Sequence, residues 1–174
     1  MAWIISIYNM SIFPLKRVIT DLKASLLQKD QISWQSHCRT LPKLRTFIQF
    51  KNFVSDSPHI FKPLSFMQRK QMSKFRLGIL HLRVETGRFL RIPPEDRVCL
   101  MCNSGEVEDE SHFLLVCGRY EQYRQNLFNC IPNIEHFRDL GNVDKIKLLM
   151  NDPTLAKQTA KFITDSYEFR STII

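Results

Sequence analysis

Apolar residues recur at helical spacing along much of this chain. Between residues 15 and 29 they stand three or four positions apart, which predicts an amphipathic helix. A second apolar seam predicts another helix over residues 65–84. Gly78 lies inside this second helix and is expected to cost it up to about 1 kcal/mol relative to alanine. The first seam is Leu15, Val18, Ile19, Leu22, Leu26 and Leu27, and the second is Met72, Phe75, Ile79 and Leu82.

The remaining segments predict shorter elements. Residues 43–54 fit either a short helix or a strand, and residues 85–96 (ETGRFLRIPPED) are expected to lead the chain out of the second helix. Asn142 and Asp152 are typical helix N-caps, and Pro153 would take the favoured first position of the last helix. We therefore expect a mostly α fold: helical arms around a small irregular knot near the middle. The expected segments are an N-terminal helical arm (1–38), a basic helical segment (39–94), the irregular knot (95–131) and the C-terminal helices (132–174).

The composition is that of a folded chain. Its 174 residues are 44% hydrophobic, with only five glycines and eight prolines, and they contain no internal repeat. No stretch approaches the roughly 18–20 successive apolar residues that a membrane helix needs. The apolar opening, MAWIISIYNMSIF, is interrupted by polar residues and follows no positive charge, so it is a poor secretory signal. We expect an intracellular protein with no membrane role, in the nucleus or the cytoplasm.

Charge is unevenly distributed within the net +8 of the chain. Residues 39–91 hold twelve Lys and Arg against two acids, a net charge of +10, whereas residues 95–123 carry a net charge of −5. A basic stretch followed by an acidic one indicates a surface that binds polyanions beside a segment that does not.

Cysteine and histidine gather in one short segment, CLMCNSGEVEDESHFLLVC, at residues 99–117. Cys99 and Cys102 form a Cys-x2-Cys pair, and His112 and Cys117 follow after nine residues. Three thiolates and one imidazole are a typical closed ligand set for a structural zinc ion. The spacing therefore predicts a zinc knuckle in which these four residues hold one structural Zn2+ and give a weakly hydrophobic loop its shape.

The spacing of His112 and Cys117 restricts this site. Five residues correspond to about 140° around an α-helix. Both side chains can face one ion if a short helix begins near Ser111 and ends at Cys117, with Gly118 in a left-handed cap. The open alternative is three buried cysteines beside an incidental histidine.

The other two cysteines are interpreted as packing residues. Cys130 extends an apolar seam of a predicted helix that continues to about Ile131. Cys38 lies at the end of the first segment, apart from this seam. Cys130 is also an alternative fourth ligand in place of His112. The seam itself, which could dock another protein, is Tyr120, Tyr123 and Leu127.

The order of these features resembles the zinc-binding C-terminal region of reverse transcriptases from non-LTR retrotransposons. The resemblance runs from about Trp34 to Phe128, through KLRTFIQFK, KFRLGILHLRVETGR, the cysteine segment and GRYEQYRQNLF. It implies a Cys-Cys-His-Cys module that follows a polymerase thumb and helps to handle RNA or target DNA. The ligands that it implies are Cys99, Cys102, His112 and Cys117.

The chain departs from that family in lacking its catalytic motifs. It has no Asp-Asp pair, so the polymerase Tyr-x-Asp-Asp motif is absent, and no endonuclease signature is present. A zinc hydrolase needs an open coordination position, which four protein ligands do not leave. His37 and Cys38 are adjacent and lack an orienting partner for nucleophilic catalysis. We expect a non-catalytic accessory module with no small-molecule substrate.

The nucleic-acid contact is expected on the basic helix rather than on the acidic knuckle. On the expected helix 65–84, arginines flank the apolar seam on one side, and lysines with His81 flank it on the other. Two alternatives are that these cations pair with the acidic knuckle or form a plain solvated face. A further alternative function is a zinc-stabilised domain for protein–protein interaction. The expected phosphate-binding residues are Arg69, Lys70, Lys74, Arg76, Arg83, Arg88 and Arg91.

Overall fold

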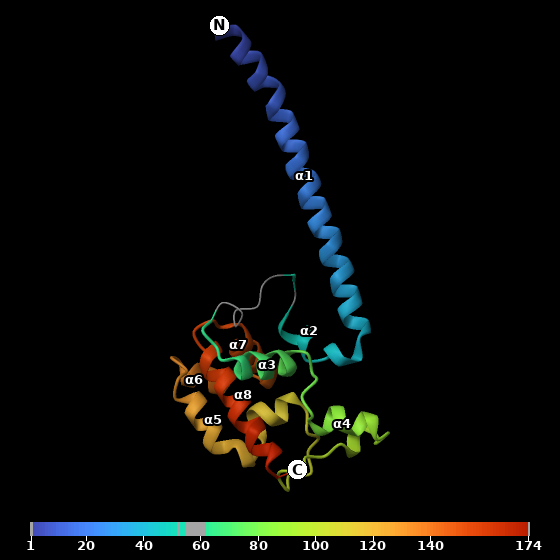
Figure 1. Cartoon of the computed structure of the whole chain (residues 1–174), viewed down its shortest axis with the longest axis vertical. Helices are drawn as coiled ribbons and strands as arrows, with labels where there is room; N and C mark the ends of the chain where they lie inside the picture. Colours follow the sequence, from blue (N-terminus) through green and yellow to red (C-terminus); the bar gives the residue numbers. More distant parts are fainter. Residues whose placement is uncertain (1, 52, 55–61, 174) are drawn as a thin grey trace. The chain divides into compact units, whose positions relative to one another are not determined.

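The computed structural model describes residues 2–51, 53–54 and 62–173 (Figure 1). The chain divides into two units, Met1–Thr40 and Leu41–Ile174. The described residues are mostly helical, so the prediction of a mostly α fold is confirmed. None of the described helices is long and apolar enough to span a membrane.

The first unit is one helix, α1 (Ala2–Thr40). The helix predicted over 15–29 is therefore present and continues to within two residues of Pro42, which cannot supply a helical N–H. Its apolar seam is exposed: Leu15, Leu22 and Leu26 are 62%, 58% and 58% exposed. Cys38, near the end of the helix, is buried, as predicted.

The second unit consists of short helices and turns. The only strand-like pairing among the described residues is an antiparallel bridge between Val98 and Val107. The helices are η1 (Pro42–Leu44), α2 (Phe47–Phe50), α3 (Phe66–Arg76), α4 (Arg83–Phe89), η3 (Pro94–Asp96), η4 (His112–Val116), η5 (Gly118–Tyr120), α5 (Glu121–Phe128), α6 (Ile134–Asp139), α7 (Asn142–Asn151) and α8 (Ala156–Ser171).

Helix α8 is the centre of this unit. It packs against α3, α5 and α7, and α2 packs on α7 (Figure 1). The Phe113 ring lies in the same core, with ring centroids 4.9 Å from Tyr120, 5.8 Å from Phe162 and 6.3 Å from Phe75. The cysteine segment therefore shares one hydrophobic core with the helices around it.

The single helix predicted over 65–84 is wrong. Helix α3 starts at the N-cap Ser65, which forms a capping box with Gln68, and it ends at Arg76. Gly78 then takes a φ of +65°, which reverses the chain. A Cβ atom at Gly78 would lie 2.7 Å from the carbonyl oxygen of Lys43, so the close approach of η1 also requires glycine.

Three further boundaries differ from the prediction. The segment expected to leave the helix instead forms most of α4 (Arg83–Phe89). Asn142 is the first residue of α7, behind an N-cap at Gly141. Asp152 lies in the turn before α8, where its Oδ1 accepts a hydrogen bond from the backbone N–H of Thr154 at 2.7 Å. Both N-cap predictions are therefore wrong, and for Asp152 the side chain caps the local turn at Thr154 instead of the helix.

Candidate metal centre

A short loop positions the first two cysteines. The Val98–Val107 bridge closes this loop, and the N–H of Cys99 donates to the carbonyl oxygen of Glu106 at 2.9 Å. Gly105 has a φ of +73°, a conformation that side chains disfavour, and it lets the loop bend back. Cys99 and Cys102 thus face the helical turn that follows.

That turn, η4, is a π-helix (His112–Val116). Its i→i+5 geometry explains how residues five apart reach one point. The N–H of Cys117 donates to the carbonyl oxygen of His112 at 2.8 Å, which brings the two side chains to the same side. The short helix expected between Ser111 and Cys117 is therefore present, with Ser111 as its N-cap and Cys117 as its C-cap. The left-handed cap expected at Gly118 is wrong, since Gly118 does not have a positive φ.

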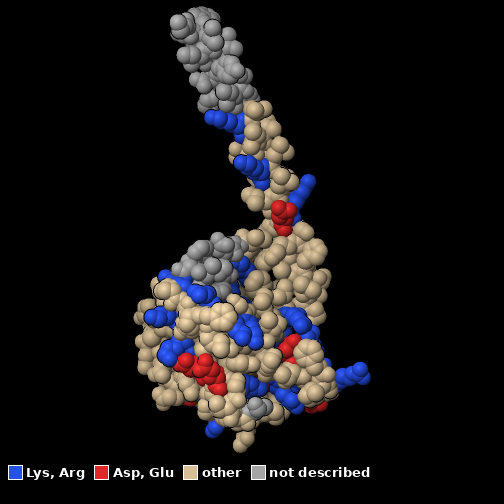
Figure 2. All heavy atoms as spheres, viewed as in Figure 1, with Lys and Arg blue, Asp and Glu red and all other residues tan. Residues whose placement is uncertain are grey.

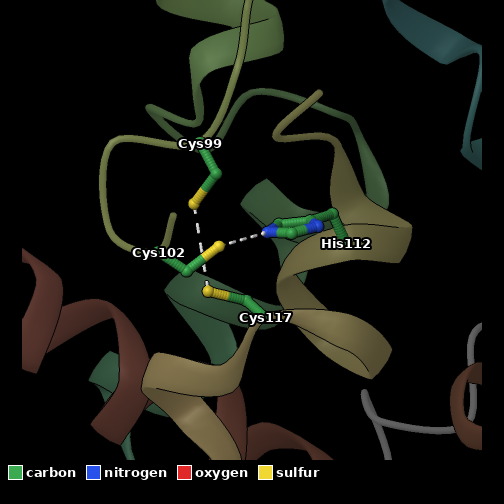
Figure 3. A group of neighbouring side chains, drawn as sticks. All are labelled: Cys99, Cys102, His112 and Cys117. Carbon is green, nitrogen blue, oxygen red and sulfur yellow. Dashed lines mark hydrogen bonds between the residues drawn. The ribbon is translucent and has the colours of Figure 1, made fainter. Parts of the chain in front are cut away.

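The four predicted ligands converge from this loop and turn (Figure 3). The Sγ atoms of Cys99 and Cys117 lie 3.9 Å apart, and Cys102 Sγ lies 3.4 Å from His112 Nε2. All four ligand atoms lie within 4.8 Å of one another, so this group can hold a metal ion. Cys99, His112 and Cys117 are buried, and Cys102 is half-buried.

Carboxylates and a hydroxyl surround the cluster. Glu106 Oε2 lies 3.0 Å from His112 Nδ1, so the other ring nitrogen, Nε2, faces the cysteines. The N–H of His112 donates to Asp109 Oδ1 at 2.7 Å, and Ser104 Oγ lies 3.3 Å from Cys102 Sγ. Such partners orient a ligand before an ion arrives.

The four ligand groups perturb one another's protonation. Hydrogen bonding with Cys117, followed by burial, raises the pKa of the Cys99 thiol to about 12. Hydrogen bonding with Cys99 is the main cause that raises the pKa of His112 to about 9. The pKa of Cys117 is lowered, chiefly by its hydrogen bond with Cys99. A bound ion must therefore displace protons that this cluster otherwise holds.

Two acids of the knuckle are buried and paired instead of exposed. Glu108 is fully buried and forms an ion pair with Arg170 of α8. Glu110 is 2% exposed and accepts from Arg45 at 2.7 Å and from Thr46 at 2.9 Å. Burial raises the pKa of both carboxyl groups, and the adjacent arginines oppose this. These ion pairs fasten the cysteine segment to α8 and to the chain before α2, which sequence spacing alone did not indicate.

The seven basic residues expected to bind phosphates differ in exposure and in their partners. Arg88 pairs with Glu85 at 2.9 Å. Arg76 is only 3% exposed: its guanidinium donates to the carbonyl oxygen of Met150 at 2.8 Å and stacks on Phe50 at 4.5 Å. Its assignment to a binding surface is therefore wrong. By exposure, Arg69, Lys70 and Arg91 are exposed, Lys74, Arg83 and Arg88 are half-buried, and Arg76 is buried.

The aromatic seam expected to dock a protein belongs to the core. Tyr120 is fully buried and Leu127 is 2% exposed, so neither offers a docking surface, and Tyr123 is half-buried. Cys130 is exposed, with its Sγ 3.4 Å from the carbonyl oxygen of Asn126, so its interpretation as a packing residue is wrong. Among the described residues, Cys130 is not part of the ligand group.

Comparisons with known proteins identify no relative: no protein-family model, no curated protein and no solved structure matches this chain. The resemblance to reverse transcriptases therefore rests on the sequence motifs alone.

Proposed function

We propose that this chain is a zinc-stabilised, non-catalytic module that binds RNA or DNA and derives from a retrotransposon reverse transcriptase. The observation that carries the proposal is the convergence of three thiols and one imidazole from a loop and a π-turn. The order of the sequence motifs supports the proposed origin from a reverse transcriptase. The exposed cationic side chains of α3 support the proposed binding of RNA or DNA.

The spacing of the ligand atoms fits zinc. A tetrahedral ion with Zn–S bonds of about 2.3 Å separates its sulfurs by about 3.8 Å, and the Cys99 and Cys117 sulfurs lie 3.9 Å apart. Four protein ligands close the coordination sphere, so the ion would be structural and would leave no position for a substrate. Thiolate-rich tetrahedral sites favour zinc over magnesium or calcium.

Nucleic-acid binding is supported by the cations that stay available on the surface. Arg69 and Lys70 are exposed on α3 and Lys74 is half-buried one turn later; none of the three pairs with an acid within the described part of the chain. Figure 2 shows Lys and Arg side chains spread over this face of the second unit, with Asp and Glu in smaller patches. Such a surface attracts phosphates through counterion release.

Binding to single-stranded RNA and to duplex DNA across a salt series tests this proposal. Each phosphate contact steepens the logarithmic salt dependence by about 0.9 on duplex DNA. Replacing Arg69, Lys70 and Lys74 together by Gln should therefore lower the affinity. It should also flatten the slope of log affinity against log salt by the amount that corresponds to nearly three lost phosphate contacts. Affinity that does not change with salt in the wild-type chain would contradict nucleic-acid binding.

A matched control removes the same charge elsewhere. Lys16, Lys23 and Lys29 are exposed on α1, in the other unit, and none of them pairs with an acid within the described part of the chain. Their triple replacement by Gln changes the net charge equally and should leave most of the salt slope in place. Equal losses in the two triple variants would indicate a diffuse charge effect instead of a site on α3.

A second candidate function, protein docking, is favoured by one observation on α1. Its seam is apolar and exposed on a helix that forms a unit of its own. An exposed stripe of this length is typical of interaction surfaces. Replacing Leu15, Leu22 and Leu26 by Gln should then abolish partner binding and leave the salt-dependent binding of nucleic acid unchanged.

A further inference from the structure

We propose that a cavity between α4 and the end of α8 is a binding site for a phosphate group. The cavity has a volume of about 310 Å³, enough for a small ligand. Leu100, from the loop between the first two cysteines, forms part of its wall. The polar residues that line it are His81, Arg83, Thr86, Tyr167, Arg170 and Ser171.

The charge of this cavity favours an anion. Arg83 and Arg170 both line it, and no Asp or Glu of the described chain does. Glu108 is buried and pairs with Arg170, so the two arginines and this carboxylate together keep one net positive charge. In a partly enclosed site this charge acts through less water than on an open surface.

The side chain of Arg83 has a donor without a partner. Its Nε atom is buried and has no hydrogen-bond partner among the described residues. A buried donor without an acceptor is costly, and nearly all such donors in folded proteins are satisfied. Because Nε is shielded from solvent, a phosphate in the cavity would meet the terminal nitrogens of Arg83, which can present two parallel N–H groups to two phosphate oxygens.

One carboxylate holds both arginines in place. Glu108 Oε2 accepts the backbone N–H of Arg83 at 2.7 Å, and Glu108 Oε1 accepts from the Arg170 guanidinium. Arg170 also donates to the carbonyl oxygen of His81 at 3.3 Å. The Arg170 guanidinium and the backbone of Arg83 are therefore positioned before a ligand binds, which lowers the entropic cost of binding.

Hydroxyl groups add donors that can be redirected. Thr86 Oγ1 now donates to the carbonyl oxygen of Leu82 at 3.2 Å, and Ser171 Oγ donates to that of Tyr167 at 2.9 Å. A hydroxyl hydrogen rotates to suit its partner. Phosphate offers several strong acceptor oxygens to such donors, whereas a halide offers none with this directionality.

The phosphate could come from free inorganic phosphate or from the end of a polynucleotide. Both present the same tetrahedral oxyanion to Arg83. The cavity does not include Arg69, Lys70 or Lys74, so its occupation is measured separately from the proposed binding to α3.

The test uses the full chain loaded with zinc, with inorganic phosphate as the first probe. Nitrogen–proton NMR of the wild-type chain should show the Arg83 Nε–Hε resonance shifting as phosphate is added. Calorimetry of Arg83→Gln should then show binding weaker by about 10- to 100-fold, the loss of a hydrogen bond to a charged group. This substitution keeps the backbone N–H of residue 83, which donates a hydrogen bond to Glu108. Arg17→Gln, exposed on α1 and outside the cavity, is the matched control and should bind phosphate as the wild type does.

The second arm compares a short oligonucleotide that carries a 5′-phosphate with the same oligonucleotide ending in a 5′-hydroxyl. A preference for the 5′-phosphate that Arg83→Gln removes identifies the polynucleotide end as the source; binding of inorganic phosphate without that preference identifies the free ion. The α3 triple variant should keep phosphate binding even if its salt slope collapses. No shift of the Arg83 resonance up to millimolar phosphate, or equal weakening by Arg83→Gln and Arg17→Gln, overturns the proposal.

Discussion

His112 and Glu106 are joined across the candidate metal centre, with Nδ1 of the imidazole 3.0 Å from a carboxylate oxygen. The contact assigns the donor role to Nδ1 and leaves Nε2 as the nitrogen that faces Cys102. A histidine that binds a metal commonly donates its second N–H to a carboxylate, which fixes the ring and makes the ligating nitrogen more basic. Glu106 is therefore a positioning residue for the ligand set.

Glu106→Ala should weaken zinc binding by about 10- to 100-fold, because His112 loses this partner. Competition with a chromogenic chelator at fixed pH measures the change. Glu95→Ala removes an exposed acid outside the cluster and should leave the affinity unchanged. If both variants bind zinc as tightly as the wild type, the contact does not position His112.

Metal analysis should find about one zinc ion per chain, and Cys102→Ser should abolish it, because a serine hydroxyl is a poor substitute for a thiolate. Cys130→Ser serves as the control, since this thiol is exposed and apart from the ligand group. Loss of zinc in Cys130→Ser, with retention in Cys102→Ser, would point to a different ligand set.

Zinc affinity should fall as the pH falls. Without an ion, His112 has a pKa raised to about 9 and Cys99 a pKa raised to about 12, so both hold a proton at pH 7. Zinc and these protons compete for the same atoms. The affinity should rise from pH 6 to pH 9, and zinc binding at pH 7 should release protons, detectable by calorimetry in two buffers of different ionisation enthalpy. Affinity that does not change over this range would contradict the ligand assignment.

The ligand group could be predicted from sequence because its four residues lie close together along the chain. Cys99 and Cys117 are eighteen residues apart, and their spacing with Cys102 and His112 restricts the chemistry to few ions. The π-turn could not be predicted, since nothing in the residues 112–116 distinguishes it from an α-turn. The π-turn is explained only by the structure, in which its i→i+5 geometry brings the side chains of His112 and Cys117 to the same point.

The long-range contacts could not be predicted for a different reason. Arg170 reaches Glu108 across 62 residues, and Arg76 reaches Met150 across 74 residues. Charge patterning predicts that Arg and Glu are exposed, so it assigned Arg76 to a surface and Glu108 to an acidic knuckle. Only the packing of α3 and α8 around one core turns these residues into structural groups.

Arg76→Ala should lower the free energy of unfolding by about 1–3 kcal/mol, because it removes a buried hydrogen bond to Met150 and the stacking on Phe50. Urea unfolding monitored by circular dichroism measures the loss. Arg69→Ala, at an exposed position of the same helix, should stay within about 0.5 kcal/mol of the wild type. The salt slope for nucleic acid should respond in the opposite way, flattening in Arg69→Ala and not in Arg76→Ala.

Gly78→Ala distinguishes the structure from the sequence pattern by the sign of its effect. Inside a helix over 65–84, alanine would stabilise the chain by up to about 1 kcal/mol. In the structure Gly78 has a φ of +65° and its new Cβ would lie 2.7 Å from the backbone oxygen of Lys43, which cannot swing aside as a flexible side chain could. We therefore expect a loss of about 1–3 kcal/mol in urea unfolding. Gly118→Ala, where the added Cβ meets nothing within 4 Å, should change stability by less than about 0.5 kcal/mol. A stabilised Gly78→Ala variant would mean that α3 continues through Gly78 and that η1 does not pack against this turn.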